Sequence, residues 1–192
     1  CRGDRDMIHA ALRAADAVLV RECPLDREAF QAMEKCRIVV RYGGLYGPGS
    51  SETLADILRK RMFPVIGSGD GMVSSVHVDD AAGGTLAALE RGRRGIYNIV
   101  DDDPAPSRDF VPAIAEALGA KPPLRIPAWL GRLVAGDVAV AMMTEGRGAS
   151  NAKAKRELGW QPFWPSWRDG FRRGLDTPIP LPDRDGTPAM RT

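Results

Sequence analysis

The chain has 192 residues, which suits one ordinary domain or one large part of a bigger protein. Apolar residues make up 44% and charged residues 27%, a balance typical of soluble proteins, and a formal net charge of +2 gives no field that favours nucleic acid. No run of 18 apolar residues occurs, so we predict no transmembrane helix and no membrane partner.

Cysteine and histidine are too few and too scattered for a zinc site. The cysteines are Cys1, Cys23 and Cys36, no CxxC motif occurs, and the histidines are His9 and His77. We therefore expect no metal, buried or idle thiols, and a reducing, cytoplasmic setting. The first residues contain neither an initiator methionine nor a signal-peptide pattern, and we expect a fragment or a processed product.

The first forty residues alternate between helical and strand patterns. Residues 5–16 carry apolar side chains at helical spacing, and residues 17–20 (AVLV) form a short apolar run typical of a buried strand. Asp26 is a plausible N-cap for a helix over residues 27–35, and residues 37–41 form the next strand. This alternation predicts a parallel sheet with crossover helices.

A loop rich in glycine and tyrosine follows, at residues 41–49 (RYGGLYGPG), and leads into a helix over residues 52–61. Ligands of open α/β sheets bind outside the carboxyl ends of the strands. Glycines let the backbone approach a ligand closely, and tyrosines offer flat faces and hydroxyls. The loop is therefore either a ligand site or a tight turn with packing tyrosines.

The remaining sequence alternates short strands with helices. The predicted elements are strands at 64–71 (with a turn), 72–78 and 96–100, helices at 81–90, 107–118, 129–143, 151–158 and 166–173, and an extended segment at 122–127. Acidic Asp79 and Asp80 open the first of these helices, Ser107 and Ser150 are predicted N-caps, and Gly159 ends the basic helix. Residues 177–192 contain four prolines and are predicted to be disordered.

Four segments, in this order, carry a family resemblance. They are residues 41–49, residues 67–80 (GSGDGMVSSVHVDD), residues 95–100 (GIYNIV) followed by Pro106 and Ser107, and residues 150–160 (SNAKAKRELGW) followed by Pro162, Trp167, Gly170 and Phe171. With these motifs, residues 37 to about 175 resemble the C-terminal half of an extended or atypical short-chain dehydrogenase/reductase, the NAD-dependent epimerase/dehydratase family.

The resemblance implies an α/β fold in which the last strands of a Rossmann-like parallel sheet are followed by a small mixed α/β substrate-binding lobe. We expect a Rossmann-like remnant over residues 1–61, the lobe with return strands and helices over residues 62–176, and a tail over residues 177–192. The first three or four strands of the family fold are absent. The resemblance therefore implies either a homodimer or a missing N-terminal half as partner.

The resemblance also implies a site. Tyr42, Gly43 and Gly44 are expected at the nicotinamide end of NAD or NADP. The residues expected around a small-molecule substrate, a sugar nucleotide or a small ketone, are Tyr46, Pro48, Met72, Ser74 and Ser75. His77 is expected to be a satisfied, partly buried histidine, and Asp79 a helix cap.

Two motifs of the family are missing from the sequence. No GxGxxG or GxxGxxG turn occurs to hold the pyrophosphate. Family members use a tyrosine with a lysine four residues later as acid and base, but here the tyrosines are followed at that spacing by Tyr46, Ser50 and Asp101. We therefore name no catalytic residue and expect an isolated chain to be inactive; the alternative is a non-catalytic binding or regulatory module.

Charged clusters in the second half have two interpretations each. Residues 101–103 (DDD) are predicted to form a solvated turn in preference to a cation site, because three adjacent carboxylates do not converge from one strand end. The basic helix with Lys153, Lys155 and Arg156 is predicted to present a solvated face in preference to a phosphate site.

Large apolar side chains gather in the same region. Trp129, Trp160, Trp164 and Trp167 are predicted to pack the small lobe, with a substrate-pocket wall as the alternative for Trp129. The adjacent Met142 and Met143 end an apolar helix and are predicted to be core residues.

Overall fold

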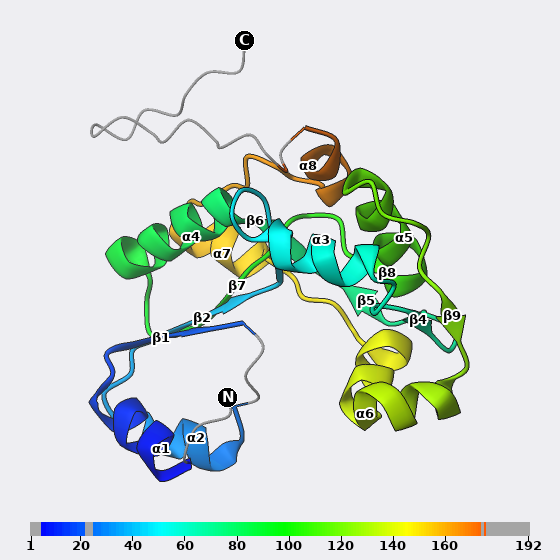
Figure 1. Ribbon diagram of the computed structural model, residues 1–192. Coiled ribbons are helices and arrows are strands. Elements are labelled where there is room, and N and C mark those ends of the chain that lie inside the picture. The colour runs from blue at the N-terminus through cyan, green and yellow to red at the C-terminus, as the bar shows by residue number, and fades with distance from the viewer. Residues whose placement is uncertain (1–4, 22–24, 174, 176–192) are drawn as a thin grey trace.

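The computed structural model describes residues 5–21, 25–173 and 175, and its first half combines helices with short strands (Figure 1). The elements of this half are α1 (Arg5–Ala14), β1 (Ala17–Val20), α2 (Arg27–Ala32), β2 (Ile38–Tyr42), β3 (Gly44–Tyr46), α3 (Ser51–Arg59), β4 (Val65–Ile66), β5 (Met72–Val73), β6 (Ser75–His77), α4 (Val78–Arg91) and β7 (Gly95–Ile99). The second half contains β8 (Ala105–Pro106), α5 (Ser107–Ala117), β9 (Arg125–Ile126), α6 (Ala128–Glu145), α7 (Ala152–Leu158) and α8 (Trp167–Arg173).

A parallel sheet in the order β1-β2-β7 organises the molecule. Successive side chains of a strand point to opposite faces, and Val39 and Val40 of the central strand enter different cores. Val40 packs with α4 and α7, whereas Val39 packs with α1 and α2, so helices cover both faces (Figure 1). The predicted Rossmann-like parallel sheet is confirmed.

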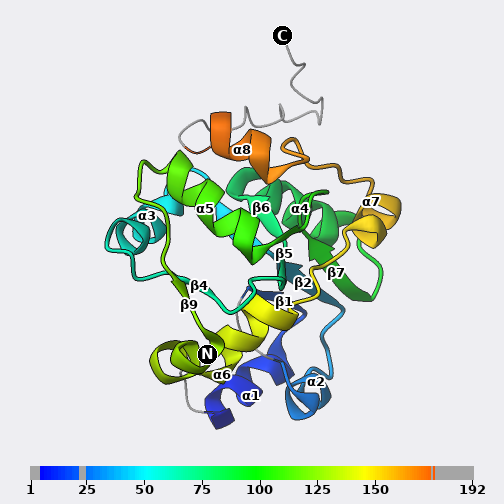
Figure 2. The ribbon, with the colours of Figure 1, turned by 90° about the vertical axis from the view of Figure 1, so that its right-hand side faces the viewer.

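Among the described residues, three two-stranded sheets accompany the first: parallel β3–β6, parallel β4–β9 and antiparallel β5–β8. A third core joins α5 and α8 through Val111, Trp167 and Phe171. Figure 2 shows α5 and α8 side by side at one end of this region and α6 at the other. β4, β5, β8, α5, β9, α6 and α8 therefore form the smaller lobe.

The expected boundary at residue 61 does not separate the two parts. β7 pairs with β2, and α4 and α7 pack on the same sheet, although all three elements come after residue 61. The chain leaves the first sheet after β2, builds part of the lobe, and returns. The return elements expected within residues 62–176 are thus part of the first body.

Several predicted elements have different ends. The strand expected over residues 72–78 breaks at Ser74, because β5 pairs with β8 while β6 pairs with β3. β3 itself lies inside the predicted glycine/tyrosine loop. Asn151 and not Ser150 is the N-cap of α7. Pro106 and not Ser107 is the N-cap of α5, and the Ser107 hydroxyl donates to the carbonyl of Gly71.

Other expectations concern burial and the chain ends. Cys36 is buried, as expected for an idle thiol, whereas Cys1, Cys23 and the tail over residues 177–192 lie outside the described residues. Within the part of the chain that the structure describes, no helix combines the length and apolarity needed to cross a bilayer.

Candidate functional site

The carboxyl end of β2 meets the start of β6. The amide of Gly44 donates to the carbonyl of Ser74 at 2.9 Å. A Cβ added to Gly43 would lie 2.4 Å from the same carbonyl oxygen, so any side chain at this position would collide with backbone. Glycine is required here by the close approach of two segments that the sequence analysis placed at one site.

Tyr42 is half-buried and held by a hydroxyl on α4. Its phenol oxygen is hydrogen-bonded to the Thr85 hydroxyl. The Thr85 hydroxyl donates its proton to the Ala81 carbonyl at 2.7 Å, so the Tyr42 phenol is the donor in its hydrogen bond to Thr85. Burial raises the pKa of Tyr42, and its hydrogen bond to Thr85 only partly offsets this. Tyr42 is therefore a neutral phenol at physiological pH and is not poised to act as a base.

Met72 and Ser74 lie half-buried on the other side of this junction. The Ser74 hydroxyl oxygen accepts the backbone N–H of Ala149 at 2.8 Å, and the amide of Met72 donates to the Gly146 carbonyl at 2.8 Å. Pro48 is also half-buried, in the turn before α3. The structure thus places Tyr42, the glycines and Ser74 close together, with the 146–149 segment beside them.

Tyr46 and Ser75 lie deeper than the other predicted site residues. Tyr46 is 1% exposed, and its ring is nearly perpendicular to those of His77 and Phe171, at centroid distances of 5.4 and 5.1 Å. Its hydroxyl has no hydrogen-bond partner among the described residues, and burial, with nearby carboxylates such as Asp101, strongly raises its pKa. Ser75 is also buried and donates to Asp101 at 2.9 Å. Both side chains are therefore part of the core behind the site.

His77 has the structural role that the sequence indicated. It is fully buried, and its Nδ1 accepts the amide of Asp79 at 3.2 Å, which makes His77 the N-cap of α4. The cap was expected at Asp79, two residues later. Imidazole replaces the usual carboxylate or hydroxyl acceptor, so a motif search for caps does not find it.

The sequence did not indicate that Asp101 is buried. It is 2% exposed, and its carboxylate accepts the Ser75 hydroxyl and the backbone N–H groups of Asp103 and Trp167. Burial raises the pKa of Asp101 to about 7, although these hydrogen bonds pull it down. The predicted solvated turn at residues 101–103 is wrong for Asp101, because the chain beyond β7 continues into the interior beside β6.

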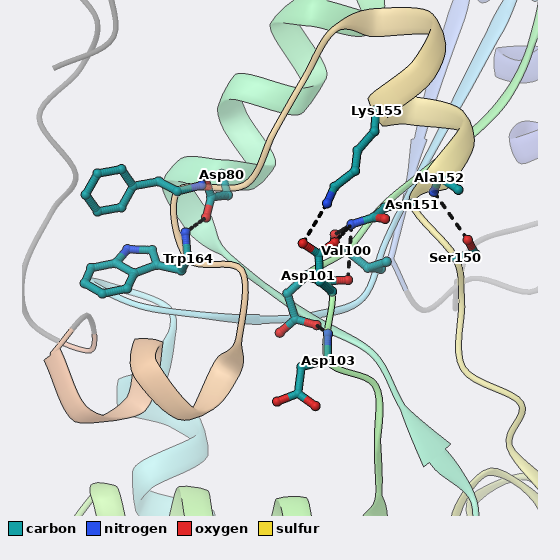
Figure 3. A network of polar contacts seen from close by, with 11 residues as sticks. Asp80, Val100, Asp101, Asp103, Ser150, Asn151, Ala152, Lys155 and Trp164 are labelled. Atoms are coloured by element: carbon teal, nitrogen blue, oxygen red, sulfur yellow. Dashed lines mark hydrogen bonds and ion pairs between the residues drawn. The ribbon is translucent and has the colours of Figure 1, made fainter. Parts of the chain in front are cut away.

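A polar network attaches the C-terminal segment to this turn. The Asn151 side-chain nitrogen donates to the Val100 carbonyl at 2.7 Å, the Asp101 carbonyl at 3.2 Å and the Asp102 carboxylate at 2.7 Å. Figure 3 shows Lys155 of α7 and Asn151, the N-cap of the same helix, reaching toward the turn. Lys155 pairs with Asp102 at 2.6 Å, so this part of the basic helix is neutralised within the protein and is not a free cationic face.

Asp80 makes the second attachment of the same segment. Its carboxylate accepts the backbone amides of Phe163 at 2.6 Å and Trp164 at 2.9 Å, more than eighty residues along the chain (Figure 3). Trp160, Trp164 and Trp167 are buried, as predicted, whereas Trp129 is exposed. The acidic residues at the start of α4 therefore have an architectural role.

The chemistry available at the site is narrow. It offers a neutral phenol, hydroxyls and backbone groups, which suit a flat ring. Residues 42–44 combine an aromatic ring with two glycines, and the sequence contains no GxGxxG or GxxGxxG turn. Among the residues that the structure describes, no group of His, Cys, Asp or Glu side chains is arranged to hold a metal ion.

Comparison with known sequences gives one strong match. A Streptomyces protein, the 3-diazoavenalumate denitrifying reductase, is 41% identical over 141 residues, which are 71% of this chain and 46% of that protein. The chain thus spans about half the length of this curated relative. No family model matches the chain.

Solved structures share the fold. A human epimerase family protein, crystallised with NADPH, has a TM-score of 0.66 at 19% identity over 88% of this chain and 71% of its own. A functionally unknown conserved protein from Silicibacter pomeroyi has a TM-score of 0.59 at 26% identity over 82% of this chain and 60% of its own. A nucleoside-diphosphate-sugar epimerase from Pseudomonas aeruginosa has a TM-score of 0.59 at 18% identity over 90% of this chain and 78% of its own.

Proposed function

We propose that this chain is the substrate-binding half of an NAD(P)-dependent reductase. Its fold is that of the NAD-dependent epimerase/dehydratase family of short-chain dehydrogenases/reductases, and it resembles the C-terminal half of that fold. The 41% identity to a reductase carries the choice of reaction among the epimerases, dehydratases and reductases of that fold. We place this reductase in the reducing cytoplasm.

The site residues have separate roles in this proposal. Tyr42, Gly43 and Gly44 would hold the nicotinamide end of NAD(P), because Tyr42 supplies an aromatic face and the two glycines have no side chain. Met72, Ser74 and Pro48 would contact the substrate from the adjoining segments. We assign Tyr46 and Ser75 to the support of these residues from behind, because both side chains are buried.

For the substrate we propose a small aromatic diazo compound that carries a carboxylate. The name of the Streptomyces relative denotes a diazo carboxylate for that enzyme, and the Tyr42 ring suits an aromatic partner. Bound NAD(P)H supplies a hydride, and a hydride that replaces a diazonium group on an aromatic ring releases N2 without a proton from the protein. A neutral Tyr42 that donates to Thr85 fits such a reaction, since the phenol positions a ring and takes no proton.

We also propose that the 192-residue chain does not catalyse this reduction by itself. Its sequence has no glycine-rich turn where backbone N–H groups and a helix N-terminus hold the pyrophosphate. The chain would then contribute substrate binding and the ring end of the cofactor site. A non-catalytic binding module has the same parts, and reconstitution of activity separates the two.

The test joins the N-terminal half of the Streptomyces reductase to this chain. The chimera and the chain alone, both checked for folding by circular dichroism, are mixed with NADPH or NADH and an aromatic diazonium carboxylate. We expect oxidation of the cofactor with N2 release by the chimera only. Tyr42→Ala should lower the rate, and the matched control Leu89→Ala, exposed on α4, should not.

Two outcomes would overturn the proposal. Turnover by the chain alone would contradict the assignment as a half enzyme. A folded chimera that binds NADPH but releases no N2 would contradict the reductase assignment and favour the binding module.

A further inference from the structure

The segment 146–149 lies directly against the proposed substrate residues. Arg147 bridges in parallel to Met72, next to the 2.8 Å hydrogen bond from the Met72 amide to Gly146. A Cβ added to Gly148 would lie 3.4 Å from both the Met72 Cβ and the Ser74 Oγ. With the hydrogen bond from Ala149 to Ser74, these contacts fix the backbone on both sides of Arg147.

Arg147 is exposed, and neither an ion pair nor a hydrogen bond of its guanidinium is found among the described residues. Other cations in the second half of the chain are paired with carboxylates: Arg108 with Asp70, Arg132 with Asp137, and Lys155 with Asp102. The N–H donors of the planar Arg147 guanidinium therefore remain available to a ligand, and the backbone that carries them is fixed.

The chemistry of that fork selects an anion. Guanidinium donates two parallel N–H bonds to a carboxylate, and such charge-assisted pairs are stronger than neutral hydrogen bonds. Met72, which is half-buried, and Met142, which is exposed at the end of α6, supply apolar surface near the same segment. A ligand with an apolar ring and an anionic end matches both features.

We propose that Arg147 is the residue that selects an anionic substrate, by binding its carboxylate beside Met72 and Ser74. This inference rests on the proposed function, because it takes Met72 and Ser74 to be substrate contacts. It adds a specificity-determining residue that no sequence motif indicated, and it predicts that the charge of the ligand matters at this position.

The test measures binding of two probes of the same shape to the full 192-residue chain by isothermal titration calorimetry. The probes are 4-hydroxycinnamate and its neutral amide. We expect the carboxylate to bind roughly tenfold more tightly than the amide, with a preference that shrinks in high salt. Arg147→Gln should abolish the preference, and Arg147→Lys should keep part of it.

Arg125→Gln is the matched control, because Arg125 is also an exposed arginine of the smaller lobe. Equal binding of the two probes, absence of binding by both, or equal effects of Arg147→Gln and Arg125→Gln would each overturn the inference. The chimera assay answers the separate question of catalysis. Loss of the carboxylate preference in Arg147→Gln, together with an inactive chimera, would keep the anion site and reject the reductase.

Discussion

Helices α6 and α7 invert the usual relation between composition and burial. α7 is short and basic, yet its Ala154 and Leu158 are completely enclosed against β7 and α4. α6 is long and apolar, yet its large side chains are mostly exposed: Trp129, Leu133, Val134, Val138 and Met142. The prediction that Met142 belongs to the core is therefore wrong, and Trp129 does not pack within the lobe.

The difference comes from the surface that each helix meets. α7 lies on the continuous face made by the parallel sheet and α4. α6 touches the small β4 strand through Gly131, where an added Cβ would lie 2.4 Å from Ile66, and its axis breaks at Gly136, where φ is +83°. A narrow contact made by small residues leaves the large ones outside. Burial therefore depends on the available partner surface and not on apolar content.

A matched pair of leucine substitutions tests the contrast between α6 and α7 most directly. Leu158 on α7 is 1% exposed and Leu133 on α6 is 76% exposed. We expect Leu158→Ala to lower the free energy of unfolding by about 2–5 kcal/mol, because it leaves a cavity. Leu133→Ala should change the same quantity by less than about 0.5 kcal/mol.

Urea denaturation followed by circular dichroism measures both values. Sedimentation at two protein concentrations is the control, because self-association through α6 would bury Leu133. Equal losses from the two substitutions in a monomeric sample would refute the contrast between the helices.

A smaller effect is expected from pH, through Asp101 at the turn that α7 holds. Its pKa of about 7 in the folded chain lies above the value of about 3.9 for an unfolded chain. Between these values the folded state binds more protons than the unfolded state, so stability falls as pH rises from 4 to 7. The loss reaches at most about 4 kcal/mol.

Asp101→Asn separates this group from the other carboxylates. Asparagine resembles the protonated form and still accepts the Ser75 hydroxyl through its carbonyl oxygen. We expect the variant to lose less stability than the parent between pH 5 and pH 8 in chemical denaturation. Parallel pH profiles for the two proteins would show that Asp101 does not titrate in this window.

The smallest effect is expected at Tyr46, whose buried hydroxyl has no partner among the residues described. Tyr46→Phe removes an unsatisfied polar group and should raise the free energy of unfolding by about 1 kcal/mol. Tyr97→Phe is the matched control, because the Tyr97 hydroxyl bonds to the backbone of Arg93 and to Glu157. That change should lower stability by about 1 kcal/mol. Equal destabilisation by the two variants would mean that Tyr46 has a bound water as partner.

Local patterns in the sequence predicted most of the elements. Apolar runs located β1, β2 and β7, and glycine ended α7 at Gly159, where φ is +61°. They did not predict that β7 returns to the first sheet, since a strand pattern contains no information about its partner. They also failed at Asp101. Three consecutive carboxylates indicate solvent, and the hydroxyl that donates to Asp101 lies on β6, far from it in sequence.

The candidate site was predicted through resemblance more than through chemistry. The structure places Gly43 and Gly44 against Ser74, as a shared site requires, but it buries Tyr46 and Ser75. β6 is buried along its whole length, and Tyr46 is the buried end of β3, a short strand that was not recognised inside the glycine/tyrosine loop. Arg147 was not singled out, because an arginine in a loop has no local pattern that distinguishes a ligand contact from a solvated side chain.

The pairing of β2 with β7 has a consequence for the order of folding. β1 and β2 are joined by a short helical connection, whereas about 50 residues separate β2 from β7, so the second pairing carries a larger loop-closure entropy. Non-local pairings of this kind slow folding. The α1-β1-α2-β2 unit should therefore acquire amide protection in pulse-labelled hydrogen exchange before β7, and closure of the sheet must wait until the intervening segment has become compact.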